Sequence, residues 1–290
     1  MRPQNLGSRI FLDGGDPAET RDIISLLGFL DGQTTNPTLI SKNPGAKKRL
    51  TQGEKFTEKE IFDFYRDVVK EISSLIPHGS ISVEVYADSS TSSEQMLSSG
   101  REMFSWISNA QIKFPTSKEG LRAAAHAVTE GLRINMTLCF SQEQAAAVYA
   151  ATRGAKKGQV YVSPFIGRLD DRGDNGMDLI ANILEMYSNG DGHVEVLTAS
   201  VRTLDHFFYA LKLGSDIITA PYEILKEWAA AGLTLPPQDY IYKREGLKDI
   251  VYKEIDLSEN WEEYNIAHDL TVKGMERFSK DWNALLYDSR

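Results

Sequence analysis

An alternation of short apolar runs with helical segments along nearly the whole chain limits the fold most strongly. We count eight strand-like runs, at 10–13, 28–32, 81–85, 110–115, 134–140, 160–165, 194–198 and 216–221. Most are followed by a segment whose apolar residues have helical spacing. Strand, turn and helix repeated in this way predict a parallel sheet with right-handed crossovers, closed as a (β/α)₈ or TIM barrel.

The length of the chain agrees with this architecture. Its 290 residues suit one barrel, since such barrels typically take roughly 250 residues as one domain. We therefore expect a single barrel domain over 1–290, in which 222–290 includes a C-terminal helical extension. A doubly wound open sheet is the rival, but the eight units and the lack of a glycine-rich dinucleotide turn count against it.

Capping signals mark where several helices should begin. An N-cap followed by a polar acceptor three residues later is typical of a helix start. Such pairs or caps occur at Asp16 before Pro17, at Thr57 with Glu60, at Thr116 with Glu119, and at Ser141 with Gln144.

Two regions stand outside the alternation. The segment 42–59 is polar and rich in lysine, so we interpret it as a solvated loop, with a phosphate or partner site as the less favoured alternative. The segment 222–265 is long, acidic and aromatic and predicts accessory structure. Beyond it, apolar residues near helical spacing predict a terminal helix that packs across the barrel or onto a neighbouring copy, giving a homo-oligomer: Leu270, Met275, Phe278, Trp282 and Leu285.

Charge and cysteine content exclude several classes of protein. With 41 acidic and 32 basic residues the net charge is -9, which disfavours nucleic acid and anionic membranes as partners. The lone cysteine, Cys139, lies in an apolar run and is expected in the core of a protein from a reducing compartment. No apolar run of about 18 residues and no signal-peptide pattern occurs, so we expect a cytoplasmic protein.

The most informative polar residue is a lysine inside an apolar strand. Lys113 alternates with Ile112 and Phe114 and should therefore point to the opposite face of the strand, which should end at Pro115. A lysine removed from water loses its proton more easily and becomes an amine nucleophile towards carbonyls. Taken alone, however, Lys113 is more simply explained as a side chain that reaches water from the strand end.

Functional groups of such barrels lie at the C-terminal ends of the strands. There this chain carries an amine, two carboxylates, hydroxyls, amides and two arginines, the latter on the late loops where barrels often hold phosphate. The candidates are Asp13, Asn36, Glu84, Lys113, Asn135, Thr137, Ser163, Arg168, Ser200 and Arg202. Each alone has a structural explanation, such as a helix cap, a turn or a surface ion pair, but together they form a coherent set.

The motifs around these residues resemble the transaldolase family, in family order. They are TTNPTLI at 34–40, IKFPT at 112–116 with EGL at 119–121, NMTL at 135–138 with FS at 140–141, SPFIGR at 163–168 and ASVR at 199–202, followed by KGMERF at 273–278. The resemblance covers most of the chain. It departs at Gly14, where many relatives have a hydroxyl residue, and in 222–265, where little is recognisable.

The resemblance implies transfer of a dihydroxyacetone unit through a Schiff base, from fructose 6-phosphate or sedoheptulose 7-phosphate to erythrose 4-phosphate or glyceraldehyde 3-phosphate, in the non-oxidative pentose phosphate pathway. Lys113 would attack the ketone and Asp13 would move the proton of the C4 hydroxyl. Glu84 and Thr137 would hold a water that shuttles protons. The same resemblance implies no metal or cofactor, because the iminium would take the place of a Lewis acid.

The remaining roles concern binding of the sugar phosphate. By resemblance, Asn36, Asn135 and Ser163 would hydrogen-bond the hydroxyls of the three-carbon unit. Arg168, Ser200 and Arg202 would hold the phosphate, for which a guanidinium fork is suited.

Two other functions compete with this interpretation. A fructose 6-phosphate aldolase of the same superfamily would release dihydroxyacetone instead of transferring it. Glu84 and Phe165 favour transfer, because aldolases of that kind have Gln and Tyr at the matching positions. A catalytically silent phosphosugar-binding barrel is the third hypothesis, and the presence of Lys113, Asp13 and Glu84 together argues against it.

Overall fold

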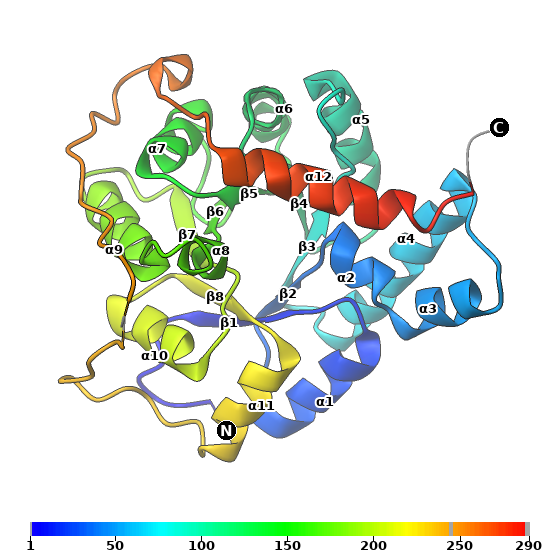
Figure 1. The fold of residues 1–290 in the computed structure, drawn as a ribbon, viewed down its shortest axis with the longest axis horizontal. Helices are drawn as coiled ribbons and strands as arrows, with labels where there is room; N and C mark the ends of the chain where they lie inside the picture. Colours follow the sequence, from blue (N-terminus) through cyan, green and yellow to red (C-terminus); the bar gives the residue numbers. More distant parts are fainter. Residues whose placement is uncertain (1, 244–245, 288–290) are drawn as a thin grey trace.

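A closed barrel of parallel strands forms the centre of the computed structural model, which describes residues 2–243 and 246–287. Within these residues each of eight strands pairs with the next, and the last pairs with the first (Figure 1). The predicted TIM barrel is thereby confirmed. The strands are β1 (Arg9–Asp13), β2 (Gly32–Thr34), β3 (Ser80–Glu84), β4 (Ala110–Pro115), β5 (Ile134–Cys139), β6 (Val160–Pro164), β7 (Val194–Thr198) and β8 (Ile217–Ala220).

Helices surround the barrel and fill the connections between its strands (Figure 1). They are α1 (Pro17–Leu27), α2 (Pro37–Ser41), α3 (Pro44–Thr51), α4 (Glu58–Leu75), α5 (Ser93–Phe104), α6 (Lys118–Thr129), α7 (Gln142–Ala151), α8 (Ile166–Asp170), α9 (Gly176–Tyr187), α10 (Leu204–Leu213), α11 (Tyr222–Ala230), the 3₁₀ helix η1 (Trp261–Glu263) and α12 (Asp269–Asn283). No helix in the described ranges is both long and apolar enough to span a membrane.

Most of the predicted helix starts are confirmed. The Asp16 side chain accepts a hydrogen bond from the backbone N–H of Ala18, and Thr57 forms a reciprocal capping box with Glu60. The prediction at Thr116 is wrong by one residue. Ser117 caps α6 instead, because the Thr116 hydroxyl donates to the carbonyl of Thr137 on the next strand and is therefore not free to cap.

The strand predicted at 28–32 is also wrong. Gly28 ends α1 with a φ of 76°, and Phe29 and Leu30 pack against the core outside any strand. The barrel strand β2 is the short segment Gly32–Thr34. It has few apolar residues, and its buried Gln33 is satisfied by the carbonyl of Gly14 and the hydroxyl of Thr20.

The segment 42–59 is likewise more ordered than the predicted loop. It contains α3, which begins after Asn43, whose side chain accepts from the N–H of Gly45. A capping Asn followed by a proline at the first helical position explains this helix start.

The two faces of β4 differ as predicted for the Lys113 strand. Ile112 and Phe114 face outward, since both side chains approach Gly100 on α5. The adjacent barrel positions point inward: the side chains of Ser82 on β3 and Asn135 on β5 meet across the interior at 3.1 Å. Lys113 lies between these two strands and shares their inward face.

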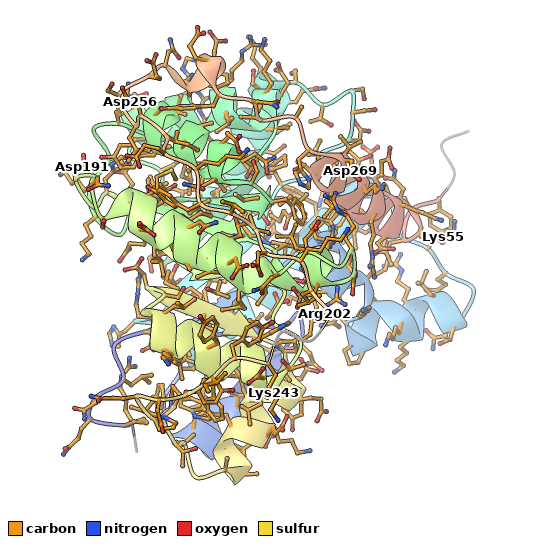
Figure 2. All side chains as sticks on the ribbon, turned by 60° about the vertical axis from the view of Figure 1, so that its left-hand side comes forward. Lys55, Asp191, Arg202, Lys243, Asp256 and Asp269 are labelled. Atoms are coloured by element: carbon orange, nitrogen blue, oxygen red, sulfur yellow. The ribbon has the colours of Figure 1, made fainter. Side chains whose placement is uncertain are left out.

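The C-terminal region covers the flank and the mouth of the barrel. After α11 an irregular segment passes along the outside of α10, α9 and α7 (Figure 1). Figure 2 shows Lys243 near one end of it and Asp256 near the other. Backbone hydrogen bonds of 2.8 Å join its Lys248 to Gly173 and Asn175. Residues 244–245 and 288–290 of the predicted extension lie outside the described residues.

Helix α12 then lies across the strand ends, as one of the two predicted placements required (Figure 1). It packs against α2, and the hydroxyl of Thr271 donates to the carbonyl of Leu138 at 3.0 Å. Phe278 and Trp282 on α12 are buried. The helix therefore forms part of the wall above the barrel.

Candidate active site

A cavity of about 410 Å³ opens at the C-terminal ends of the strands, beneath α12. Seven of the predicted site residues line it: Asp13, Asn36, Lys113, Ser163, Arg168, Ser200 and Arg202. The other three, Glu84, Asn135 and Thr137, are buried and do not line this cavity. Among the predicted residues the structure therefore distinguishes a group that faces the cavity from a group that supports it.

Lys113 lies at the floor of the cavity with only 3% of its surface exposed. Its register places it beside Glu84 on the neighbouring strand, and its Nζ lies 2.7 Å from Glu84 Oε2. The same Nζ donates a hydrogen bond of 3.0 Å to the backbone carbonyl of Thr35. Two fixed acceptors on β3 and just after β2 thus hold the amine in one place.

Glu84 is a carboxylate in an unusual environment. Burial raises its pKa above the ordinary value, and the neighbouring ammonium of Lys113 opposes that shift. Its Oε2 makes the ion pair without a well-directed hydrogen bond, and the buried hydroxyl of Thr137 also has no partner among the described residues. Buried polar atoms of this kind, a carboxyl of raised pKa and an unpaired hydroxyl, are suited to bind a water, and the carboxyl can exchange a proton with it.

Asp13 approaches the cavity from the end of β1. Thr34 donates its hydroxyl proton to Asp13 Oδ1 at 2.7 Å, so the hydroxyl of Thr219, 2.6 Å from that of Thr34, must be the donor in the second bond. Burial raises the pKa of Asp13, while Lys113 and the Thr34 hydroxyl oppose that shift. Asp13 can therefore both accept and return a proton near neutral pH more readily than an exposed aspartate.

Beneath the cavity, polar side chains form a continuous chain. Ser163 donates to Asn135 Oδ1 at 2.6 Å, and the amide nitrogen of Asn135 donates to Ser82 at 3.1 Å. This orientation leaves the hydroxyl oxygen of Ser163 as an acceptor towards the cavity. Asn36 lines the cavity and is also the N-cap of α2, because its Oδ1 accepts a hydrogen bond from the N–H of Leu39.

Three arginines line the cavity near one another, namely Arg168, Arg202 and Arg277. Arg168 lies over the rings of Phe165 and Phe278, each with its centroid 5.3 Å away, and forms no ion pair with a carboxylate in the described part of the chain. Burial and the charges of Arg277 and Arg202 lower its pKa. An arginine held by aromatic rings, with its hydrogen-bonding fork unused, is suited to bind an anion.

Arg202 differs from Arg168 because it already has a carboxylate partner. Both of its terminal nitrogens donate hydrogen bonds to the carboxylate of Asp171, each at 2.6 Å, and Arg202 is labelled in Figure 2. The neighbouring Ser200 adopts a φ of 60°, an uncommon conformation for a residue with a side chain. Strained backbone of this kind often occurs at binding sites.

Several residues that line the cavity were not among the predicted site residues. Thr34 holds Asp13, while Lys42 and Arg277 add positive charge. Lys42 directly follows α2 and Arg277 comes from α12, so neither is at a strand end. Cys139, by contrast, is in the core as predicted, and burial raises the pKa of its thiol to about 12.

Known proteins that are similar to this chain share one family description. The family model described as Transaldolase/Fructose-6-phosphate aldolase matches residues 10–289. A protein of Anaeromyxobacter dehalogenans named probable transaldolase is 40% identical over 78% of this chain and 91% of its own length. A protein of Brucella ovis with the same name is 40% identical over 94% of this chain and 96% of its own length.

Proposed function

Because the chain belongs to the transaldolase/fructose-6-phosphate aldolase family, we propose that it is a transaldolase in which Lys113 carries a dihydroxyacetone unit as a Schiff base. The observation that carries this proposal is the buried Lys113 Nζ, held 2.7 Å from Glu84 and facing a cavity that Asp13 also lines. The donor substrates of the proposed enzyme are ketose phosphates such as fructose 6-phosphate or sedoheptulose 7-phosphate, and its acceptor substrates are aldose phosphates. The reaction belongs to the non-oxidative pentose phosphate pathway in the cytoplasm.

The first half of the reaction forms an imine on Lys113 and cleaves the C3–C4 bond of the ketose. The ammonium of Lys113 first gives a proton to the water held by Glu84 and Thr137. The resulting amine adds to the C2 carbonyl of the ketose, and loss of water gives an iminium. Asp13 removes the proton of the C4 hydroxyl, the C3–C4 bond breaks, and its electron pair moves into the iminium to give an enamine. The aldose product leaves while the three-carbon unit stays on Lys113.

The second half reverses these steps with a new aldehyde. The enamine carbon attacks the carbonyl of the acceptor, and Asp13 returns the proton to the oxygen that becomes the new C4 hydroxyl. Water then adds to the iminium and releases the ketose from Lys113. Glu84 and Thr137 hold the water for the hydration and dehydration steps, which their burial and unused hydrogen-bonding capacity support.

The phosphate of the substrate binds at the arginine side of the cavity. The fork of Arg168 has no carboxylate partner among the described residues, and Arg202 and Ser200 line the same cavity. The hydroxyls of the three-carbon unit bind Ser163 and Asn36, while Asn135 orients Ser163 from below. A phosphate at this place leaves the carbonyl end of the sugar towards Lys113.

The test compares transfer with release. The purified protein is given fructose 6-phosphate with and without erythrose 4-phosphate, and glyceraldehyde 3-phosphate and free dihydroxyacetone are both measured. A transaldolase forms glyceraldehyde 3-phosphate rapidly only when the acceptor is present. If free dihydroxyacetone is released as fast as it is transferred, the protein is an aldolase instead.

The variant Glu84→Gln sharpens this comparison. We expect turnover to fall by on the order of 10², as for loss of a general acid–base group. The fraction of dihydroxyacetone released, relative to that transferred, should rise. Unchanged turnover and an unchanged ratio would remove Glu84 from the proposed chemistry.

A further inference from the structure

A buried tyrosine outside the cavity contacts both strand ends that hold Lys113. Tyr65 on α4 is fully buried and does not line the cavity. Its hydroxyl accepts from the backbone N–H of Glu84 at 2.9 Å and lies 2.6 Å from the hydroxyl of Thr35. Glu84 and Thr35 are the two residues whose oxygens bind Lys113 Nζ.

The direction of every hydrogen bond in this group follows from a count of its protons. The Thr35 hydroxyl donates its single proton to the carbonyl of Ser82 at 2.8 Å, so it can only accept from Tyr65. The order is therefore Glu84 N–H to Tyr65, Tyr65 to Thr35, and Thr35 to Ser82. Each hydroxyl is used once as donor and once as acceptor in a region without water contact, where such a chain is rigid.

Two aromatic contacts also hold the ring of Tyr65 in place. It packs against Trp106 with the ring centroids 5.8 Å apart and against Trp282 with the centroids 5.9 Å apart. Trp282 belongs to α12, the helix that lies across the barrel mouth. The hydroxyl is thus held in place by contacts that come from both the helical layer and the terminal helix.

We propose, on the basis of the proposed transaldolase function, that Tyr65 is a positioning residue that sets the Glu84 carboxylate and the Thr35 carbonyl at the distances Lys113 requires. Tyr65 reaches Lys113 only through these two residues and does not touch the cavity. Without its hydroxyl, the N–H of Glu84 loses its partner and the end of β3 is free to shift. The amine is then less precisely placed for attack on the ketone.

The test uses Tyr65→Phe, which keeps the packed ring and removes only the hydroxyl. We expect kcat for transfer from fructose 6-phosphate to fall about tenfold, the order of effect of one displaced hydrogen bond. KM should change less than about twofold, since no substrate contact is lost. Rates are referred to the number of active sites, titrated by borohydride trapping of the substrate imine.

The matched control is Tyr187→Phe. Tyr187 is also buried, and its hydroxyl donates to the carbonyl of Ala145 at 2.7 Å, away from the cavity. This variant should retain kcat although it too loses a buried hydrogen bond. Equal losses of kcat in both variants would mean that Tyr65 acts only through general stability and would overturn the proposal.

The other end of the hydrogen-bond chain gives a second test if Tyr65→Phe does not fold. Thr35→Val removes the hydroxyl that accepts from Tyr65, and Thr35→Ser keeps it. We expect Thr35→Ser to recover most of the kcat that Thr35→Val loses; equal rates for both would contradict the proposal. If the wild type itself traps no imine and transfers nothing, it is the proposed function that fails.

Discussion

Asp13 and Glu84 are both carboxyls at the ends of barrel strands, but their surroundings assign them different tasks. Asp13 lines the cavity and accepts a hydrogen bond from the hydroxyl of Thr34. Glu84 is buried against Lys113. Burial raises the pKa of both groups. Of the two, only Asp13 lines the cavity, which agrees with the role proposed for it.

The raised pKa of Asp13 predicts the acid side of the pH–rate profile. Asp13 must be ionised to take the C4 proton, so activity is lost as the pH falls through its pKa. Because burial raises this pKa above 3.8, the acid limb of kcat/KM should lie above that value. Asp13→Asn should reduce kcat by about 10²–10⁴ and remove the limb from the residual rate. An unchanged limb in the variant would assign it to another group.

One of the two predicted phosphate arginines, Arg168, allows a separate test at the residue scale. Arg168→Ala should raise KM for fructose 6-phosphate by about 10- to 100-fold, the range expected for loss of hydrogen bonds to a charged group. KM for unphosphorylated fructose should stay nearly constant, as should both values in the control Arg172→Ala, which pairs with Asp174 and Asp269 outside the cavity. Equal effects on phosphorylated and unphosphorylated donors would rule out a phosphate role.

Among the elements, those with both an apolar run and a local cap could be predicted from the sequence. The strand of Lys113 and the helix after Thr57 are examples, and their faces and starts agree with the structure. The strand β2 could not be found in this way, because it is short and its buried Gln33 is satisfied by distant partners. Helix α3 has too few apolar residues to show a helical pattern. Its start is marked only by the capping Asn43 and the proline that follows it.

Helix α12 depends on a hydrogen bond that sequence patterns do not reveal. The Thr271 hydroxyl donates to Leu138 and accepts from Gln144 at 2.8 Å. Leu138 lies in an irregularity of β5 with a φ of 59°, so its carbonyl is not part of a regular ladder. Thr271 therefore joins α12 to the barrel by giving the Leu138 carbonyl a hydrogen bond that the regular strand pairing does not supply.

Thr271→Val should show how much this connection contributes. The variant keeps the shape of the side chain but leaves the Leu138 carbonyl and the Gln144 amide without this partner. We expect the free energy of unfolding to fall by about 1–3 kcal/mol, measured by denaturant unfolding of the full chain. The exposed Thr129→Val should change it by less than about 0.5 kcal/mol. Equal losses in both would contradict the role given to Thr271.

For the molecule as a whole, the barrel explains why a list of strand-end residues could predict so much of the cavity. Closing the sheet brings residues as distant in sequence as Asp13, Lys113 and Arg202 around one opening. Lys42 and Arg277 could not be predicted in this way, because helices and their ends bring them there. The net charge of -9 also gave no sign that cations gather at the cavity. The homo-oligomer through α12 stays a prediction.

Lys113 is the residue that we propose to form the covalent bond to the substrate. This proposal is tested most directly by borohydride reduction in the presence of fructose 6-phosphate, followed by mass spectrometry of the peptides. We predict that the added mass lies on the peptide that carries Lys113, requires the substrate, and disappears in Lys113→Ala. Adduct on Lys42, the other lysine that lines the cavity, or adduct that persists in Lys113→Ala, would contradict the account.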